Sequence, residues 1–197
     1  LTEVLLLAST TWTPAFDCKA YVYVIGGGGS GGAATSYQIA GYAAAASGGA
    51  GGGAALSLMT LSAGVTYTAT IGAGGAYQPS LATPGNDKTG NAGSATTFSG
   101  SNIATMTGNG GNGGNAGTSI STSLTATGAT GGTATGGTLG NYTGGSSGDA
   151  TTNMTTGYGC SSTGGGSIAL LGPAQSSGTA HTDNTAAGNR STVSGGA

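Results

Sequence analysis

Glycine returns at every third position in GNGGNGGNAG, at residues 108, 111, 114 and 117. The same interval recurs in short pieces at 128 and 131, 137 and 140, and 145 and 148. A period of three belongs to the extended left-handed helix, which makes no hydrogen bonds within itself. Glycine at this interval lets backbones approach closely, so lateral bonds can satisfy their N–H and C=O groups. The spacing predicts polyglycine-II-like segments packed side by side after residue 107.

A flexible Gly/Ser/Thr linker is the alternative for this region. It leaves unexplained why the interval of three recurs, and why the apolar run SIALLGP follows at 167–173. Glycine loses much conformational entropy when it is ordered, so only a cooperative array of such segments would be stable.

Charge is almost absent from the chain. Three basic and five acidic residues are present among 197, and none lies within 20–86 or 89–148. Disordered chains are usually rich in charge and proline, so disorder fits poorly. Large apolar side chains are too few for an ordinary helical or α/β core. The net charge of −2 predicts no positively charged surface for nucleic acid. No apolar run is long enough for membrane insertion.

Short strands separated by glycine blocks are predicted in the first hundred residues, at 4–8, 20–25, 55–61 and 66–71. In 20–25, Tyr21, Tyr23 and Ile25 share one face, while Val22 and Val24 share the other. The glycines that follow at 26–32 mark an exit into backbone that packs closely against other backbone. A hairpin is predicted from ATTFSG and NIATMTG, turning around 99–102.

The predicted fold class is therefore all-β and irregular, with almost no helix. No stretch sustains a 3.6-residue period, and YAAAAS at 42–47 is the one place where a helical turn could form. We expect a β-rich glycine-rich domain at 1–107, with a Gly/Thr-rich extended region at 108–197 packed on it. The chain ends at SGGA as a truncated sequence would.

Catalytic, cofactor and metal sites are not predicted. Gly26, Gly28 and Gly31 satisfy G-x-G-x-x-G, but neither a helix pattern nor the ribose-binding acid follows them. The single histidine, His181, has no ligand partners at metal-binding spacing. Cys18 and Cys160 could form a disulfide, but two free buried thiols are the favoured state. With no nucleophile, base and acid available as a set, an enzyme is the least expected class.

Several segments together resemble a known family. They are TTWTPAFDCKAYVYVIGGGGSGG, GGAGGGAALSLMTLSAGVTYTATIGAGG, GNAGSATTFSG and GNGGNGGNAG. The chain resembles, over about 10–117, the glycine-rich domain of bacteriophage tail fibres and tail-tip adhesins. The most specific match is the signature YTATIGAGG at 67–75. The chain lacks the family's usual Val between Thr13 and Pro14, and its C-terminal half is Thr-rich.

The resemblance implies a non-enzymatic virion protein in the phage tail, outside the cell. It implies a rigid glycine-rich scaffold whose loops bind a host cell-surface receptor, either protein or glycan. Other tail proteins would be partners, and a homotrimer is one expected assembly. Aromatic side chains outside strand patterns are the candidates for receptor contact, because they offer rigid contact area: Tyr37, Tyr42, Tyr77, Tyr142 and Tyr158.

Each of these tyrosines could instead simply cover glycine-rich backbone. Two other functions also stay open. One is a structural or decoration protein of the virion without receptor contact. The other is an ice-binding protein, because Thr127, Thr130 and Thr133 recur at three and could line one face.

Overall fold

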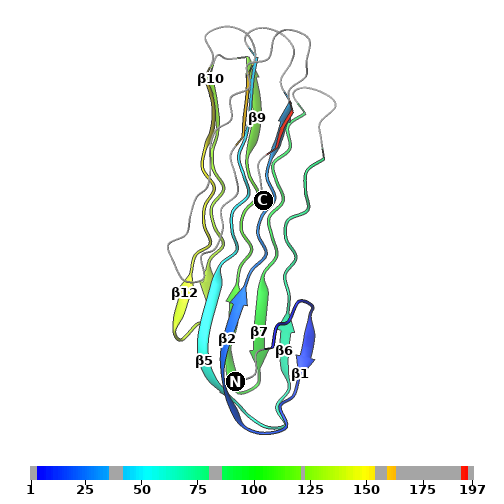
Figure 1. Ribbon diagram of the computed structural model, residues 1–197, viewed down its shortest axis with the longest axis vertical. Coiled ribbons are helices and arrows are strands. Elements are labelled where there is room, and N and C mark those ends of the chain that lie inside the picture. Colours follow the sequence, from blue (N-terminus) through cyan, green and yellow to red (C-terminus); the bar gives the residue numbers. More distant parts are fainter. Residues whose placement is uncertain are drawn as a thin grey trace.

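The computed structural model describes residues 4–35, 42–79, 86–120, 123–153, 159–162 and 192–194. These residues form an all-β column in which strands gather at both ends and extended backbone connects them (Figure 1). The described part of the chain contains no helix, and so none that could cross a membrane. The strands are β1 (Thr10–Trp12), β2 (Cys18–Ile25), β3 (Ala33–Thr35), β4 (Tyr42–Ala46), β5 (Ala54–Leu61), β6 (Tyr67–Thr70), β7 (Thr96–Gly100), β8 (Ile103–Gly108), β9 (Ala116–Ile120), β10 (Ser123–Ala126), β11 (Ala134–Thr135), β12 (Gly140–Tyr142), β13 (Ala150–Asn153), β14 (Gly159–Ser162) and β15 (Thr192–Ser194).

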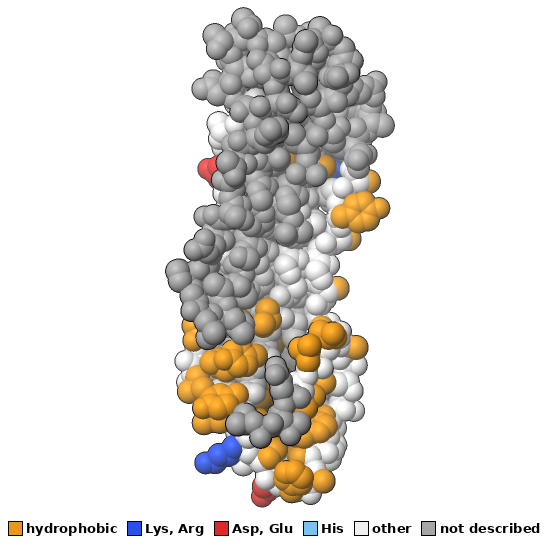
Figure 2. All heavy atoms as spheres, viewed as in Figure 1, with side chains coloured by type: hydrophobic (Ala, Val, Ile, Leu, Met, Phe, Trp, Pro, Cys, Tyr) orange, Lys and Arg blue, Asp and Glu red, His pale blue; other side chains and the backbone are white. Residues whose placement is uncertain are grey.

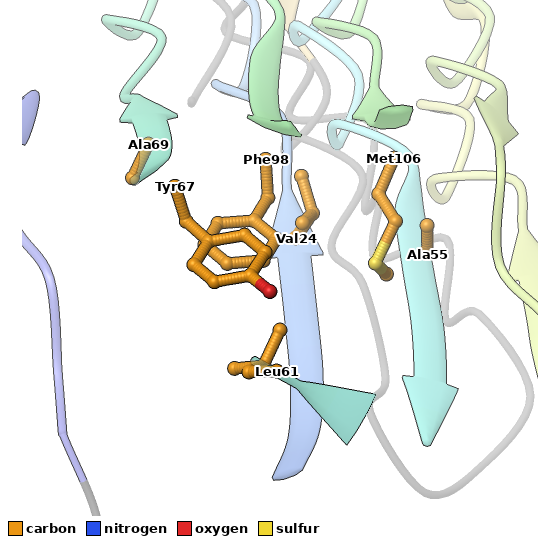
Figure 3. Close-up of a cluster of buried hydrophobic side chains, with 7 residues drawn as sticks. All are labelled: Val24, Ala55, Leu61, Tyr67, Ala69, Phe98 and Met106. Carbon is orange, nitrogen blue, oxygen red and sulfur yellow. The ribbon is translucent and has the colours of Figure 1, made fainter. Parts of the chain in front are cut away.

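Two antiparallel sheets pack face to face at the lower end of Figure 1. One has the order β1-β6-β7-β8-β11 and the other β12-β5-β2. Their inner faces share the only core of large side chains in the described residues, and Figure 3 shows its buried members: Val24, Ala55, Leu61, Tyr67, Ala69, Phe98 and Met106. Burial of these side chains is the conventional, hydrophobic part of the stability.

Tyr67 is the centre of this core. Its ring stacks on Phe98 with centroids 5.7 Å apart, and its hydroxyl accepts a 2.8 Å hydrogen bond from the Ser62 amide. Gly100 lies opposite Tyr67 in the register, and a Cβ at Gly100 would meet the Tyr67 ring at 2.5 Å. A glycine here therefore makes room for a buried aromatic ring.

Strands at the upper end pack through alanine instead. β4 lies between β14 and β9, and four consecutive alanines of β4 are fully buried. Ala44 and Ala46 pack towards Ala34 of β3, whereas Ala45 packs towards Ala126 and Ala150. Because alternate residues of a strand point to opposite faces, small side chains on both faces let layers approach closely on either side.

Seven extended segments span the space between the two ends. In the sequence, each segment is next to a lower strand, an upper strand or one of each. Successive segments run in opposite directions. They are 26–32, 47–53, 72–75, 90–94, 109–115, 128–133 and 144–147, here called the glycine segments. At about 3.3 Å per strand residue and about 3.1 Å per extended-helix residue, the run from Cys18 to Thr35 spans about 60 Å.

The strands predicted at 20–25, 55–61 and 66–71 and the hairpin around 99–102 are confirmed as β2, β5, β6 and the β7–β8 pair. Two local predictions are wrong. Residues 4–8 are not in a strand, and pairing with β6 begins instead at Thr10. YAAAAS forms strand β4 rather than a helical turn, because neighbouring strands on both sides outweigh the helix propensity of alanine.

Glycine segments and strands occur both before and after residue 107, where we expected one region to end and the next to begin. Segments 26–32 and 47–53 are already part of the extended bundle, and strands continue beyond 107. The physical reason is that lateral bonds need neighbours from the whole chain. Segment 109–115, for example, bonds to 26–32, 47–53 and 90–94.

Candidate functional surfaces

Segment 26–32 is bonded to neighbours on several sides. Every third amide donates to segment 47–53, through Gly26 to Gly53, Gly29 to Ala50 and Gly32 to Ser47, at 2.9, 2.8 and 3.0 Å. The next amides along donate to segment 90–94, through Gly27 to Ser94 and Ser30 to Asn91, at 3.0 and 2.9 Å. Segment 26–32 in turn accepts from segments 109–115 and 72–75. A strand in a flat sheet has two neighbours, so this arrangement is a three-dimensional lattice of extended helices.

The lattice closes on itself in triangles. Segment 26–32 donates to 47–53, 47–53 donates to 109–115, and 109–115 donates back to 26–32. The same cyclic order holds for the other sets of three neighbours: 26–32 with 90–94 and 109–115; 26–32 with 90–94 and 72–75; 109–115 with 128–133 and 47–53; 47–53 with 144–147 and 128–133. This is the predicted polyglycine-II-like packing. Each inner segment is therefore bonded to neighbours in several directions.

Space, rather than backbone conformation, requires glycine in this lattice. Among the described residues, only Gly64 and Gly136 have positive φ, and both lie in turns outside the glycine segments. A Cβ at Gly26, Gly29 or Gly32 would overlap the carbonyl group of a residue in segment 109–115. Side chains are therefore excluded wherever one segment faces another.

An exposed polar ladder follows from the same geometry. In segment 109–115, two glycines of each triplet face neighbouring backbones, and the third position carries asparagine. The three Asn side-chain amides each donate to a threonine hydroxyl of the next segment, at 3.0, 2.6 and 3.0 Å. The pairs are Asn109 with Thr133, Asn112 with Thr130, and Asn115 with Thr127. The expectation that the three threonines share a face agrees with this geometry.

The described receptor-contact candidates do not come together. Tyr42 begins β4 at the upper end and is half-buried. Tyr77 is 82% exposed and lies beside the lattice, where Gln78 bonds to Thr89. Tyr142 is 52% exposed and pairs with Ala54 in β12, at the junction of the lattice and the lower sheets. Tyr37 and Tyr158 lie outside the described residues.

A larger aromatic surface lies on the outer face of the β12-β5-β2 sheet. The register places six large side chains in adjacent rows on the side away from the core. We call this surface the tyrosine face, and its members are Tyr21, Tyr23, Ile25, Leu56, Leu58 and Tyr142. Most are well exposed, with Tyr21 at 65%. Figure 2 shows hydrophobic side chains gathered over the lower end of the molecule. The predicted strand 20–25 already contained the signal for this surface, because its two faces are both apolar although only one can face the core.

Groups suited to chemistry are sparse in the described residues. No set of three His, Cys, Asp or Glu residues there could hold a metal ion. Cys18 is a free, half-buried thiol, while His181 and the side chain of Cys160 lie outside the described part. Every buried side-chain polar atom of the described residues has a hydrogen-bond partner. The distinctive features are therefore the lattice and the surfaces it holds in place.

Comparison with known proteins identifies the family of the chain. No curated protein matches the chain. A family model described as a glycine-rich domain matches residues 6–197, nearly the whole sequence. The chain therefore belongs to the glycine-rich domain family.

Proposed function

We propose that this chain is a bacteriophage tail-fibre or tail-tip adhesin domain that binds a host cell-surface receptor. The observation that supports the proposal is the lattice of glycine segments. It holds the lower sheets and the upper strands apart along a column of about 60 Å from Cys18 to Thr35. A fibre tip must transmit contact forces without collapsing, and lateral bonding in several directions provides that stiffness.

Receptor contact is proposed at the upper end. Binding residues are commonly carried on loops that a rigid scaffold positions. The chain reverses direction there between β3 and β4 and between β9 and β10. Of the described candidates, Tyr42 and Tyr77 lie nearer to that end than Tyr142 does. The proposed partners are a host receptor and other tail proteins, and the proposed location is the extracellular virion tail. No enzymatic step is part of the proposal.

Binding of the purified chain to intact candidate host cells tests this proposal, with competition against phage adsorption as the readout. We expect the chain to bind and to reduce adsorption. Tyr77→Ala should weaken both effects, and Tyr142→Ala, at the junction of the lattice and the lower sheets, serves as the matched control. Cell binding without competition would favour a different role for the surface. Absence of both effects across the hosts would favour a structural or decoration protein of the virion.

The Asn–Thr ladder supports ice binding as a second candidate. Thr127, Thr130 and Thr133 are exposed at intervals of about 9 Å, three residues at about 3.1 Å each. Thermal hysteresis of the purified chain tests this function. Thr130→Lys should abolish the hysteresis if the ladder is the ice-binding surface, and Thr68→Lys, on the exposed face of β6, should leave it unchanged.

A further inference from the structure

The tyrosine face is an outer sheet surface that the described residues leave exposed. In β2 and β5 the inward residues enter the core, as Val24 and Ala55 do. Their outward neighbours in the register are Tyr21 with Leu58 and Tyr23 with Leu56. A half-buried antiparallel sheet normally presents polar residues on its outer face. An outer face built from tyrosine, leucine and isoleucine is therefore suited to contact with another surface.

The size of this face fits pairing with another protein surface. Tyr21, Tyr23, Ile25, Leu58 and Tyr142 are exposed by 65%, 47%, 42%, 42% and 52%. At roughly 200 Å² per large side chain, these fractions leave about 500 Å² of exposed side-chain surface. Two such faces in contact would bury at most about 1,000 Å² from these side chains, which is the lower limit for a specific interface.

The charge distribution of this face is compatible with a second copy of the chain. Lys19 is the single charged residue on these outward rows, and it lies at the lower margin, opposite Thr60. Two identical copies of this face would therefore meet without like-charge repulsion at its centre. Tyrosine and leucine rows can also pack on identical rows. A two-fold pairing with antiparallel strands would also keep the two Lys19 side chains at opposite margins.

We propose that the tyrosine face is a self-association surface that pairs two copies of this chain. The pairing is isologous: Tyr21 and Tyr23 of one copy pack against the same sheet face of the other. Because the buried area is small, the dimer is weak, with a dissociation constant on the order of micromolar or higher. The upper end of each column, where receptor contact is proposed, takes no part in this pairing.

Sedimentation velocity of the full chain over a concentration series tests the proposal. Wild type should shift from monomer to dimer as concentration rises. Tyr21→Thr with Tyr23→Thr should raise the dissociation constant about a hundredfold, because four central aromatic side chains leave each dimer. Threonine suits an exposed strand position, so the sheet should be retained. Tyr77→Thr removes an exposed tyrosine elsewhere and should leave the dimer unchanged.

A monomer at every concentration would overturn the proposal, as would a double variant that dimerises like wild type. If the double variant does not fold, NMR of wild type provides the decision. Resonances of Tyr21, Tyr23, Leu58 and Tyr142 should shift with concentration. Shifts confined to other surfaces would overturn the proposal, and so would shifts that appear only when another protein is added. Failure of receptor binding would leave these results unaffected.

Discussion

At single positions in the lattice, the small volume of glycine matters more than the chemistry of a side chain. Gly29 faces the carbonyl of Asn112 so closely that a Cβ there would overlap it. Its neighbour Gly28 is exposed, and a Cβ at that position would lie 3.7 Å from the nearest atom outside its chain neighbours, the Ala50 oxygen. Neither of these adjacent glycines has positive φ, but only Gly29 lacks the space for a side chain.

Gly29→Ala should destabilise the fold by about 1–3 kcal/mol or more, because the added methyl group forces two backbones apart. Gly28→Ala is the matched control, and its effect should stay within about 0.5 kcal/mol. Alanine also restricts the unfolded chain, which favours folding slightly. Chemical denaturation of the two variants measures the difference, and equal stabilities would contradict the assigned role of Gly29.

At the scale of elements, the upper strands depend on small side chains. Ala45 of β4 is fully buried and packs against Ala126 and Ala150. Valine has a higher strand propensity than alanine. It also adds two methyl groups to the Cβ at a fully buried site, so packing and strand propensity act in opposite directions.

Ala45→Val should destabilise the protein by about 1–3 kcal/mol, since overpacking outweighs the gain in strand propensity. Thr68→Val in β6 is the control, because Thr68 is exposed and valine suits an exposed strand position. Thermal unfolding followed by circular dichroism compares them. A higher melting temperature for Ala45→Val would mean that β4 is loosely packed.

How much of an element can be predicted depends on whether its sequence alternates. β2 and β6 were predictable because large and small side chains, or apolar and polar ones, alternate along them. Segment 109–115 was predictable because asparagine marks its one exposed row. Segment 26–32 faces neighbours on several sides, so nearly all its residues are glycine and nothing in its sequence marks the period or the partners. β4 was missed because a run of alanines alone also fits a helix.

The candidate surfaces also have parts that the sequence predicts and parts that depend on the fold. The spacing of Thr127, Thr130 and Thr133 predicted that they would share a face. Their asparagine partners depend on which segment lies next to 128–133, and that is a property of the whole bundle. The tyrosine face likewise needs β12 beside β5, a pairing between residues far apart in sequence.

At the scale of the whole molecule, peptide groups rather than large side chains fill most of the interior that the described residues form. Among the described residues, the buried apolar side chains are mainly alanine, and the core of large side chains lies at the lower end. The free energy of folding should therefore depend on lateral hydrogen bonds to an unusual extent.

The heat capacity of unfolding should be low for a chain of this length. Exposure of apolar surface raises the heat capacity and exposure of polar surface lowers it. We expect a value below the usual range of about 12–15 cal/mol/K per residue. Differential scanning calorimetry over a series of pH values, or with stability variants, measures this quantity. A value within the usual range would indicate a larger apolar core than the one described.

Hydrogen exchange of the lattice amides tests the central claim most directly. If the glycine segments form a cooperative array, the amides of Gly29, Gly111 and Gly114 should be protected almost to the free energy of global unfolding. They should also exchange together, because each closes a cycle of lateral bonds. A flexible linker would leave the amides of 109–115 exchanging as fast as those of the unfolded chain in the same buffer. That result would contradict the lattice, whereas slow and concerted exchange is what this account predicts.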